Sequence, residues 1–340
     1  MMSIKPLITV VTPVFNLIAG GREKYFRECM DSVHNQDYPN IEHIVVDGLS
    51  FDGTEKLINE YVGKGWCSLV RKKDNGIDEA YNNGIEVAKG KYIFFMNSDD
   101  FYYSDKSLSI CVNKLEEENA DYCFGCEQRI QRSGKKDFFW EPKIECFWHD
   151  MPFSHQTLGI RRDVLNKLGN YDTSCGYGGD YKLVIDLIIG DYKGVSINEI
   201  ISYYRLGGVS SQINNKAQQF RTIDILGKRI LDFSKNFYSE MDIDDATSIY
   251  LEARSNPYIF PKKYINKLIR FMVNLNLKNF DYNSFIQYAI NLSRPKSSVQ
   301  NGGITRFYLF NRILLLKRVI KNNKRRYYLF GFVPVLKITT

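Results

Sequence analysis

The stretch YIFFMNSDD, residues 92–100, joins a run of large apolar side chains to four polar ones. The apolar run has the length and composition of a buried β-strand. Two adjacent carboxylates, Asp99 and Asp100, follow at its end. Neighbouring carboxylates repel each other, so their burial requires a cation or hydrogen-bond donors. The segment therefore predicts a core strand that ends at a charged site.

Strands and helices alternate on the N-terminal side of this segment. Apolar, β-branched runs predict strands at 8–15, 41–48 and 67–72. Helical spacing predicts helices at about 21–35, 52–62 and 76–90, and another at 104–119. This alternation is typical of an α/β fold, with a mostly parallel central sheet and helices in the crossover connections. The segment at 123–140 predicts a hairpin around Ser133 and Gly134.

Polar side chains follow the predicted strands at the edge where such sheets bind ligands. Thr12 and Pro13 close the first strand, Asp47 ends the second, and Asp99 and Asp100 end a later one. Ligands bind at the carboxyl ends of the strands in open α/β sheets. We therefore expect these residues to line one crevice.

A divalent metal would resolve the repulsion between the two acids. Mg²⁺ and Mn²⁺ prefer oxygen ligands, and Mg²⁺ commonly takes one or two carboxylates together with phosphate oxygens. Asp99, Asp100 or both are thus candidate ligands of a metal that holds a diphosphate. The alternative is a solvated turn in which an Asp caps the following helix.

In this context the chain resembles the inverting family 2 glycosyltransferases of the GT-A fold, of the type that builds bacterial surface polysaccharides. The resemblance extends from Ile8 to Ser211. It rests on six stretches in the family's order: VVTPVFN (10–16), IVVDGLSFDGT (44–54), KDNGIDEAYNNGIEVAKGKYIFFMNSDD (73–100), HQTLGIRRDVLNKLGNYD (155–172), GGDYKLVIDL (178–187) and YRLGGVSS (204–211). The third stretch is the most specific.

The resemblance implies a nucleotide-sugar donor, for which UDP is favoured over GDP and dTDP. Asp47 would contact the base, with Thr12 and Pro13 beside it. Asp74 would lie near the base and ribose, with Arg71 close by. From the residues alone, Asp47 also fits a helix cap, and Asp74 fits a plain turn with Asn75 and Gly76.

The resemblance also implies that NSDD is the metal-binding motif, with Asp99 as the principal ligand of Mn²⁺ or Mg²⁺. The chain departs from the family at Asn97, where the motif has its first acid. An Asn side chain can hydrogen-bond a ribose hydroxyl but adds no charge. Ser98 would lie beside it at the nucleotide.

A catalytic base is expected near the start of an apolar helix. Asp180 follows glycines and precedes Leu183 and Val184, and an acid gains stabilisation at a helix N-terminus. The family places its general base at the equivalent acid. A simple helix cap is the alternative, and Asp186 and His155 are further candidates for the base.

Two other segments would serve the acceptor side. His155 and Gln156 precede a strand-like stretch, and a lone His is more often structural than catalytic. Gly207 and Gly208 permit either a turn or closure of a loop over the substrate.

Charge is distributed unevenly along the 340 residues. No Asp or Glu follows Asp281, whereas this end carries eleven Lys and Arg; the remainder has 35 basic and 39 acidic residues. The asymmetry predicts an anionic partner for the tail, either a membrane surface or nucleic acid. No nucleic-acid-binding motif supports the second, and many family members act on lipid-linked acceptors at the cytoplasmic face of the membrane. We predict a catalytic domain at 1–215, a helical region at 216–292 and a basic, amphipathic, membrane-associating tail at 293–340.

The sequence also argues against several other classes of protein. Cys123 and Cys126 have metal-like spacing but no companion pair, so reduced thiols of a cytoplasmic protein fit better than zinc. A signal peptide, a membrane-spanning segment and an internal repeat are not predicted. Three rival functions stay open: a sugar-1-phosphate nucleotidyltransferase, for which Gly20, Gly21 and Arg22 would form the phosphate loop, a non-catalytic glycan-binding or scaffold protein, and an adaptor acting through its tail.

Overall fold

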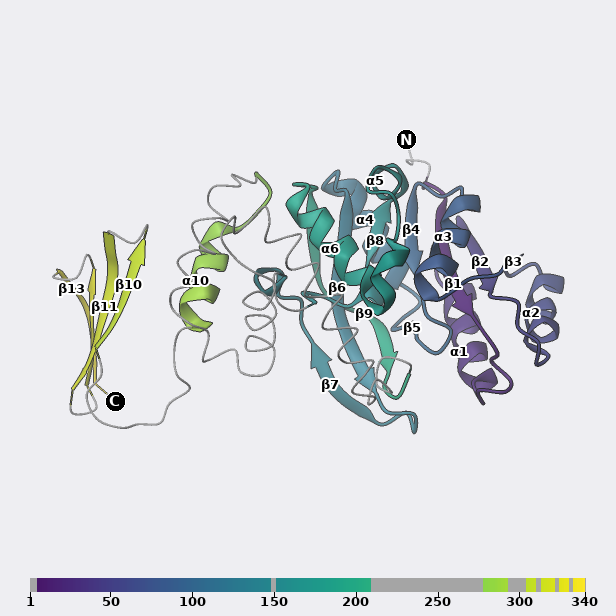
Figure 1. Ribbon diagram of the computed structural model, residues 1–340, viewed down its shortest axis with the longest axis horizontal. Coiled ribbons are helices and arrows are strands. Elements are labelled where there is room, and N and C mark those ends of the chain that lie inside the picture. Colours follow the sequence, from purple (N-terminus) through teal and green to yellow (C-terminus); the bar gives the residue numbers. More distant parts are fainter. Residues whose placement is uncertain are drawn as a thin grey trace. The chain divides into compact units, whose positions relative to one another are not determined.

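The computed structural model describes residues 5–147, 151–208, 278–292, 304–309, 313–321, 324–329 and 333–339. The chain divides into two compact units, residues 1–226 and 227–340. Figure 1 shows a broad sheet flanked by helices in the first unit and a small antiparallel sheet in the second.

The described part of the first unit alternates strands and helices as the sequence predicts. Its main elements are β1 (Ile8–Val14), α1 (Glu23–His34), β2 (Ile41–Asp47), α2 (Thr54–Gly63), β3 (Ser68–Arg71), α3 (Ile77–Val87), β4 (Tyr92–Phe95), β5 (Phe101–Tyr102), α4 (Ser107–Glu117), β6 (Tyr122–Ile130), β7 (Lys136–Trp140), β8 (Gly159–Arg161), α5 (Arg162–Lys167), α6 (Gly179–Ile189) and β9 (Gly194–Arg205). Short 3₁₀ turns lie at Ile144–Cys146, His155–Thr157 and Thr173–Gly178.

The sheet is parallel in its first half and mixed in its second. Its strand order is β3-β2-β1-β4-β8-β6-β9-β5, and β7 pairs with β6. β1 runs parallel to both β2 and β4, whereas β8 is antiparallel to β4 and β6. The predicted hairpin is confirmed as β6 and β7, with Gly134 at a φ of 84° in the turn. The α/β, GT-A-like fold inferred from the sequence is therefore correct.

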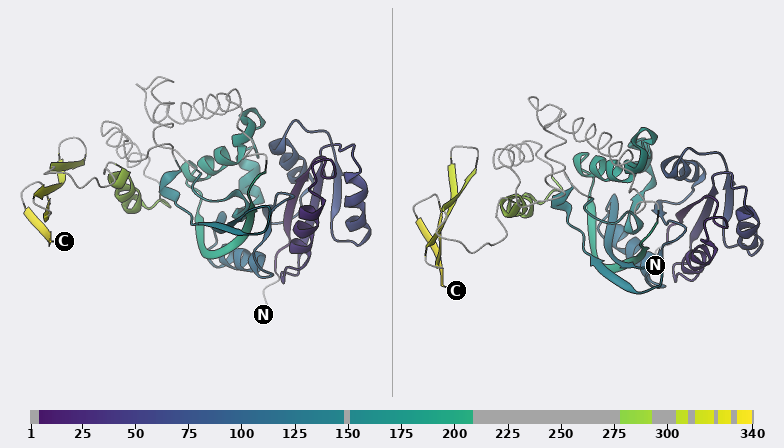
Figure 2. Two further views of the ribbon diagram at one scale, coloured as in Figure 1. Left: turned by 90° about the horizontal axis from the view of Figure 1, so that it is seen from below. Right: turned by 60° about the horizontal axis from the view of Figure 1, so that its bottom comes forward.

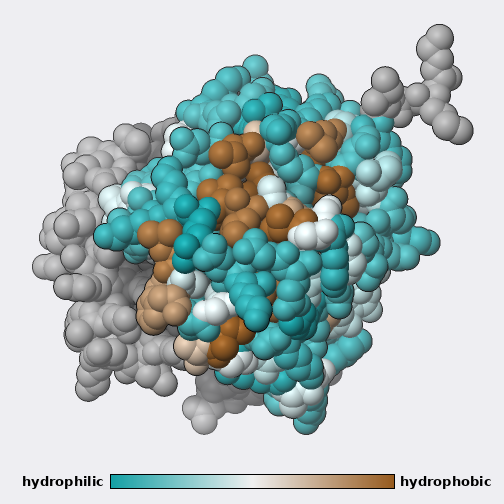
Figure 3. Space-filling view, turned by 90° about the vertical axis from the view of Figure 1, so that its right-hand side faces the viewer, coloured by the Kyte–Doolittle hydropathy of each residue, from teal (hydrophilic) through white to brown (hydrophobic). Residues whose placement is uncertain are grey.

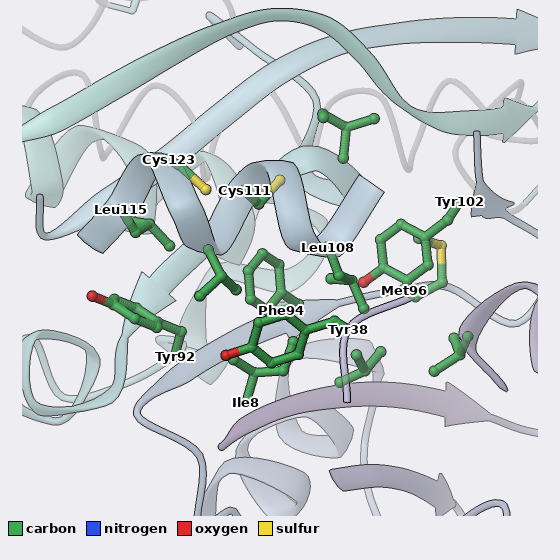
Figure 4. Packing of buried hydrophobic residues seen from close by; sticks show 14 of the residues in the cluster. Ile8, Tyr38, Tyr92, Phe94, Met96, Tyr102, Leu108, Cys111, Leu115 and Cys123 are labelled. Atoms are coloured by element: carbon green, nitrogen blue, oxygen red, sulfur yellow. The ribbon is translucent and has the colours of Figure 1, made fainter. Parts of the chain in front are cut away.

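Helices cover both faces of this sheet (Figure 2). On one face, α4 packs against β6 and β9, and its residues Leu108, Cys111 and Leu115 belong to one apolar cluster with Phe94 and Ile8 (Figure 4). This burial of apolar area removes the central strands from water on that side. It also fixes where β4 ends, and thus where the NSDD segment leaves the core.

On the opposite face, α3 approaches β1 and β2 through Gly84. A Cβ placed on Gly84 would come within 2.4 Å of Val11 Cγ1 and 3.1 Å of Val46 Cγ2. Only a glycine permits this approach without displacing the strands. The close contact holds α3 against the sheet directly beside the predicted nucleotide crevice.

Gly84→Ala is therefore expected to lower the free energy of unfolding by about 1–3 kcal/mol, the usual effect of overpacking a core. Gly63→Ala in α2 is the matched control, because a Cβ there meets no atom within 4 Å. The control is expected to be neutral or slightly stabilising. Equal urea midpoints for the two variants would contradict the tight approach of α3.

The second unit contains α10 (Tyr282–Leu292) and a four-stranded antiparallel sheet. Its strands are β10 (Ile304–Leu309), β11 (Ile313–Lys321), β12 (Lys324–Leu329) and β13 (Val333–Thr339). The sequence analysis assigned no strands to this basic tail. α10 agrees with the end of the predicted helical region, whereas residues 209–277 lie outside the described residues.

Candidate functional site

The carboxyl ends of β1, β2 and β3 bring several of the predicted nucleotide-binding residues together. Asp47 is 0% exposed and accepts hydrogen bonds from Arg71 Nε at 3.0 Å and Ser50 N at 3.0 Å. Arg71 also donates to the carbonyl of Ser50. Asp47 thus holds the loop after β2 and positions the partly exposed Arg71 guanidinium, which also pairs with Glu55 at 3.0 Å.

Asp74 lies against the same loop. A Cβ on Gly48 would come within 2.4 Å of Asp74 Oδ2, so the backbone after β2 passes directly under this carboxylate. Burial raises the pKa of Asp74, and the charges of Glu79 and Asp47 add to the effect. A hydrogen-bond donor from a ligand would relieve this cost, since it would stabilise the charged carboxylate.

Thr12 and Pro13, by contrast, have no free surface in the crevice. Thr12 is 0% exposed, and its hydroxyl shares a 3.0 Å hydrogen bond with His43 Nε2 in the core. Pro13 is also buried. Both residues support the end of β1, and the loop that follows it supplies the exposed surface.

The loops after β1 and β2 expose large apolar side chains. Phe51 is 83% exposed and forms an edge-to-face pair with Phe15, with ring centroids 6.4 Å apart. Leu49 and Ile18 are exposed in the same two loops. The face of the molecule on the side of α2 and β3 carries hydrophobic patches in an otherwise hydrophilic surface (Figure 3).

In the turn after β4, the two adjacent acids Asp99 and Asp100 have different environments. Asp100 is 1% exposed, and both of its carboxylate oxygens accept hydrogen bonds. Oδ1 accepts from the backbone N of Arg205 at 2.7 Å, and Oδ2 accepts from Gln156 Nε2 at 3.0 Å and Asn97 Nδ2 at 3.2 Å. Asp100 therefore ties the turn to β9 and to the 3₁₀ turn at 155–157, and its oxygens are already used.

Asn97 and Ser98 belong to the same turn. The side-chain oxygen Oδ1 of Asn97 accepts a 2.7 Å hydrogen bond from Tyr81 OH. Its amide faces Asp100, so Asn97 bridges α3 and the acid. Ser98 is 5% exposed, which leaves it little surface for a ligand.

Asp99 has a different environment. Its carboxylate lies mostly within the protein, and desolvation raises its pKa, opposed by the charges of Arg22, Arg205 and Arg132. Among the described residues, it forms no ion pair or side-chain hydrogen bond with any of these arginines. A desolvated carboxylate whose hydrogen bond within the described residues comes from backbone rather than from a cationic side chain is suited to bind a cation.

Arg205 builds this environment, although the sequence analysis did not single it out. Its Nε donates to the carbonyl of Asp99 at 3.0 Å, and its guanidinium pairs with Glu28 at 2.5 Å and stacks on Tyr25. A buried arginine at the end of β9 thus fixes the backbone on which Asp99 is carried. The sequence signal that could have identified Arg205 is its position directly before the Leu-Gly-Gly segment.

Arg22 and Arg132 complete the surroundings of Asp99, and each is held by one backbone carbonyl. Arg22 Nη2 donates to Phe15 O at 2.5 Å, and Arg132 Nη2 donates to Gly207 O at 2.6 Å. Neither guanidinium pairs with a carboxylate within the described part of the chain. A guanidinium has five donors, so each retains donors for an anion.

Asp180 is the second residue of α6. Its Oδ1 accepts a 2.7 Å hydrogen bond from the backbone N of Tyr181. The side chain keeps part of its surface open, yet enough protein surrounds it that desolvation raises the pKa of Asp180 to about 6. Its charge also raises the pKa of Tyr81 and Tyr171, which places all three in one neighbourhood.

His155 is a core residue. It is 6% exposed, its Nε2 lies 2.5 Å from Tyr171 OH, and its ring stacks on Phe95. Desolvation lowers the pKa of His155 to about 3, so the ring is neutral at physiological pH. We assign it a structural role, and Gln156 reaches the site only through Asp100.

Asp186 and the two glycines occupy distinct places. Asp186 is paired with Lys182 at 2.5 Å, an arrangement that suits an ion pair on the helix surface rather than a base. Gly207 has a φ of 92°, and a Cβ on Gly208 would lie 3.5 Å from Asp99 Oδ2. This loop therefore passes beside Asp99, next to Arg132.

The described residues contain no cluster of three or more His, Cys, Asp or Glu side chains arranged for a metal. Mg²⁺ commonly needs only one or two carboxylates when phosphate oxygens complete its shell. Asp99 meets that requirement. Asp100 is the less suitable of the two acids, since its oxygens already accept three hydrogen bonds and leave about one further lone-pair site.

The sequence is similar to those of known glycosyltransferases. The family model for glycosyl transferase family 2 matches residues 9–177. An uncharacterized glycosyltransferase of Rickettsia prowazekii is 33% identical over 196 residues, which cover 52% of this chain and 57% of that protein. The minor teichoic acid biosynthesis protein GgaB of Bacillus subtilis is 27% identical over 247 residues, covering 67% of this chain and 27% of that protein. The matches to these relatives thus span little more than half of their length, or less.

Two solved structures share the fold. TarS of S. aureus, residues 1–349 in complex with UDP-GlcNAc, superimposes with a TM-score of 0.54 at 14% identity, over 84% of this chain and 88% of that one. The mannosyltransferase PcManGT of Pyrobaculum calidifontis, in complex with GDP-Man and Mn²⁺, gives a TM-score of 0.51 at 16% identity, over 85% and 86%. At such identities the likeness concerns the fold alone.

Proposed function

This chain belongs to glycosyltransferase family 2, and from that premise we propose that it is a metal-dependent, inverting glycosyltransferase. It moves a hexosyl or N-acetylhexosaminyl group from a nucleoside diphosphate sugar, with UDP favoured, to a hydroxyl of a lipid-linked or growing surface glycan. The main support for the proposal is the position of Asp180, a partly exposed carboxylate in the first turn of α6 that accepts a hydrogen bond from the backbone N of Tyr181. Desolvation there raises its pKa to about 6.

Asp180 would take the proton of the acceptor hydroxyl. A general base works best when its pKa lies near the operating pH. A surface carboxylate, with a pKa near 4, would be charged at physiological pH but weakly basic. Desolvation makes Asp180 a stronger base while leaving it ionised above about pH 6. The hydroxyl, once deprotonated, would attack the sugar from the face opposite the leaving diphosphate.

The nucleotide would lie at the ends of β1, β2 and β3. Arg71 and Asp74 offer a cation and an acceptor there, and Asp47 holds the loop that places them. The exposed rings of Phe15 and Phe51 supply apolar surface for a base. TarS, whose structure was solved with UDP-GlcNAc, favours UDP as the first donor class to examine.

Asp99 would hold Mn²⁺ or Mg²⁺, which neutralises charge on the leaving diphosphate. The relative PcManGT contains Mn²⁺ with its donor. Asn97 provides no carboxylate for the metal. More of the negative charge on the diphosphate would therefore be neutralised by basic side chains of the protein. Arg22 and Arg132, each with unused donors, would bind phosphate oxygens on either side of Asp99.

Arg132→Gln is expected to weaken binding of the nucleoside diphosphate about tenfold or more, because hydrogen bonds to charged groups contribute about 1.5–3 kcal/mol. Binding of the matching monophosphate should change much less. Lys135→Gln, in the same hairpin and also exposed, is the control for lost positive charge. Titration calorimetry measures all four affinities, and equal losses for both variants would remove Arg132 from the diphosphate site.

A screen of UDP-, GDP- and dTDP-sugars with Mn²⁺ tests the reaction, with release of the nucleoside diphosphate as the readout. The nucleotidyltransferase would instead release pyrophosphate from a nucleoside triphosphate and a sugar 1-phosphate. A glycan-binding or scaffold protein would bind glycan and release neither product. Release of pyrophosphate, or of nothing across the panel, contradicts the proposal.

The acceptor would be presented at the cytoplasmic face of the membrane, where the basic tail contacts anionic lipid. Among the described residues, no helix combines the length and apolarity needed to cross a membrane. The relative GgaB is named for the biosynthesis of teichoic acid, a surface glycan polymer.

A further inference from the structure

The basic tail contains a repeat that the sequence analysis missed. RFYLFNRILLLK, residues 306–317, and RYYLFGFVPVLK, residues 326–337, are identical at six of twelve aligned positions. The identical positions include the first and last residue of each copy, Arg306 with Arg326 and Lys317 with Lys337. The two copies are short and differ in their middle residues, so the repeat is weak in sequence.

The described residues of each copy belong to two strands of the C-terminal sheet that pair with each other. β10 pairs with β11 and β12 pairs with β13, both antiparallel. The register shifts at equivalent places, between Phe307 and Tyr308 and between Tyr327 and Tyr328. The first and last residues of each copy are cross-strand partners. Arg306 is the partner of Lys317, and Arg326 is the partner of Lys337.

The register gathers the basic residues on one face of this sheet. Residues alternate between faces along a strand, and cross-strand partners share a face. Arg326 is the partner of Val319, which shares its face with Lys317 and Lys321, and Lys321 is the partner of Lys324. We define the basic face by Arg306, Lys317, Lys321, Lys324, Arg326 and Lys337. Of the basic strand residues, Arg318 and Arg325 occupy the other face, among apolar positions such as Leu316 and Ile320.

Three of the cross-strand pairs on the basic face join like charges. They are Arg306 with Lys317, Lys321 with Lys324, and Arg326 with Lys337. Like charges directly opposite each other destabilise an antiparallel pair. No Asp or Glu follows Asp281, so the tail itself has no acid with which to compensate them. An external polyanion would relieve all three repulsions.

We propose that the basic face of the C-terminal sheet binds an anionic membrane surface. Neighbouring strands lie about 4.8 Å apart, so the six charges are spread over a broad face rather than along a single line. Such a spread matches the charge of many headgroups at once, and a basic residue near an anionic membrane contributes about 1 kcal/mol. The choice of membrane rests on the lipid-linked acceptor proposed above.

The two faces provide a matched pair of variants of the full-length chain. The double variant Lys317→Gln, Arg326→Gln removes two charges from the basic face. The double variant Arg318→Gln, Arg325→Gln removes two charges from the opposite face, at the neighbouring positions in the sequence. The probes are vesicles of phosphatidylcholine with and without phosphatidylglycerol, read by sedimentation at low and high salt. The first double variant is expected to bind anionic vesicles about tenfold to thirtyfold more weakly, at about 1 kcal/mol for each residue, and the second less than threefold.

Thermal unfolding of both double variants checks that loss of binding is not loss of the fold. Removing like charges from opposed pairs should leave the melting temperature unchanged or raise it at low salt. Equal losses of vesicle binding in the two variants would overturn the assignment to one face. Loss of binding to an RNA oligonucleotide with vesicle binding retained would overturn the membrane as the partner.

Absence of vesicle binding by the unsubstituted chain would overturn both the face and the proposed membrane association. Sugar transfer to a soluble acceptor, measured in parallel, tests the proposed glycosyltransferase activity independently of membrane binding. The two proposals are therefore distinguished by the same preparation of protein.

Discussion

Asp180→Asn is expected to lower the rate of sugar transfer by about 10²–10⁴-fold, the usual loss when a general base is removed. This corresponds to about 3–5 kcal/mol of additional barrier. Asn keeps the size of the side chain and caps a helix nearly as well as Asp. Donor affinity should stay near that of the unsubstituted protein, because the nucleotide residues lie on other elements.

The pH dependence of the rate provides an independent check on Asp180. Its pKa of about 6 predicts that kcat rises as pH increases through 6, as the carboxylate becomes a base. In the Asn variant this rise should disappear. A variant that transfers sugar within about threefold of the original rate would contradict the base and leave Asp180 as a polar residue of the first turn of α6.

The contribution of Asp180 to folding stability should fall as pH rises, whereas the rate of transfer should increase. The folded-state pKa of Asp180 is raised from 3.8, so its contribution to stability is fully present below the unfolded pKa and is lost as pH rises through about 6. Asp180→Asn should therefore raise the melting temperature at pH 8 relative to pH 4. The gain is less than about 3 kcal/mol, because a partly open carboxylate retains some hydration.

Asp99→Asn is expected to abolish Mn²⁺-dependent binding of the donor and to reduce transfer about 10²-fold or more, as expected when leaving-group stabilisation is lost. The fold should persist, since the Asp99 carboxylate forms no side-chain hydrogen bond among the described residues. Calorimetric titration of the nucleoside diphosphate with Mn²⁺ and with EDTA measures the effect. Full activity of the unsubstituted enzyme in EDTA would contradict a role for the metal.

Asp100→Asn is the matched comparison, one residue further along. Its carboxylate accepts hydrogen bonds from Arg205, Gln156 and Asn97, and an amide cannot accept all three. This variant should lose stability by about 1–3 kcal/mol, the cost of buried donors left without an acceptor. The adjacent acids are thus expected to separate into one that binds and one that anchors.

The first half of the fold could be predicted from the sequence because its signals are local. Apolar, β-branched runs mark β1, β2 and β4, and helical spacing marks the helices between them. The glycine of the β6–β7 turn is equally local. Residues at the carboxyl ends of parallel strands then follow from the topology alone, which is how Asp47 and Asp99 were found.

The partners of those residues could not be predicted, because they depend on contacts between distant segments. Asp100 is held by the backbone of Arg205, 105 residues later in the chain. Thr12 lies on the strand as predicted, yet it is oriented toward His43 rather than the crevice. Likewise, the basic residues of the tail were visible in the sequence, whereas their segregation to one face depends on the strand register.

The assignment as a glycosyltransferase is tested by release of nucleoside diphosphate from a panel of UDP-, GDP- and dTDP-sugars with Mn²⁺ and acceptor, measured for the original protein and Asp180→Asn together. We expect at least one donor class to support release by the original protein, and we expect the Asn variant to bind the same donor without turning it over. If no donor supports release, or if the variant turns over as fast as the original protein, the assignment as a glycosyltransferase with Asp180 as its base is contradicted.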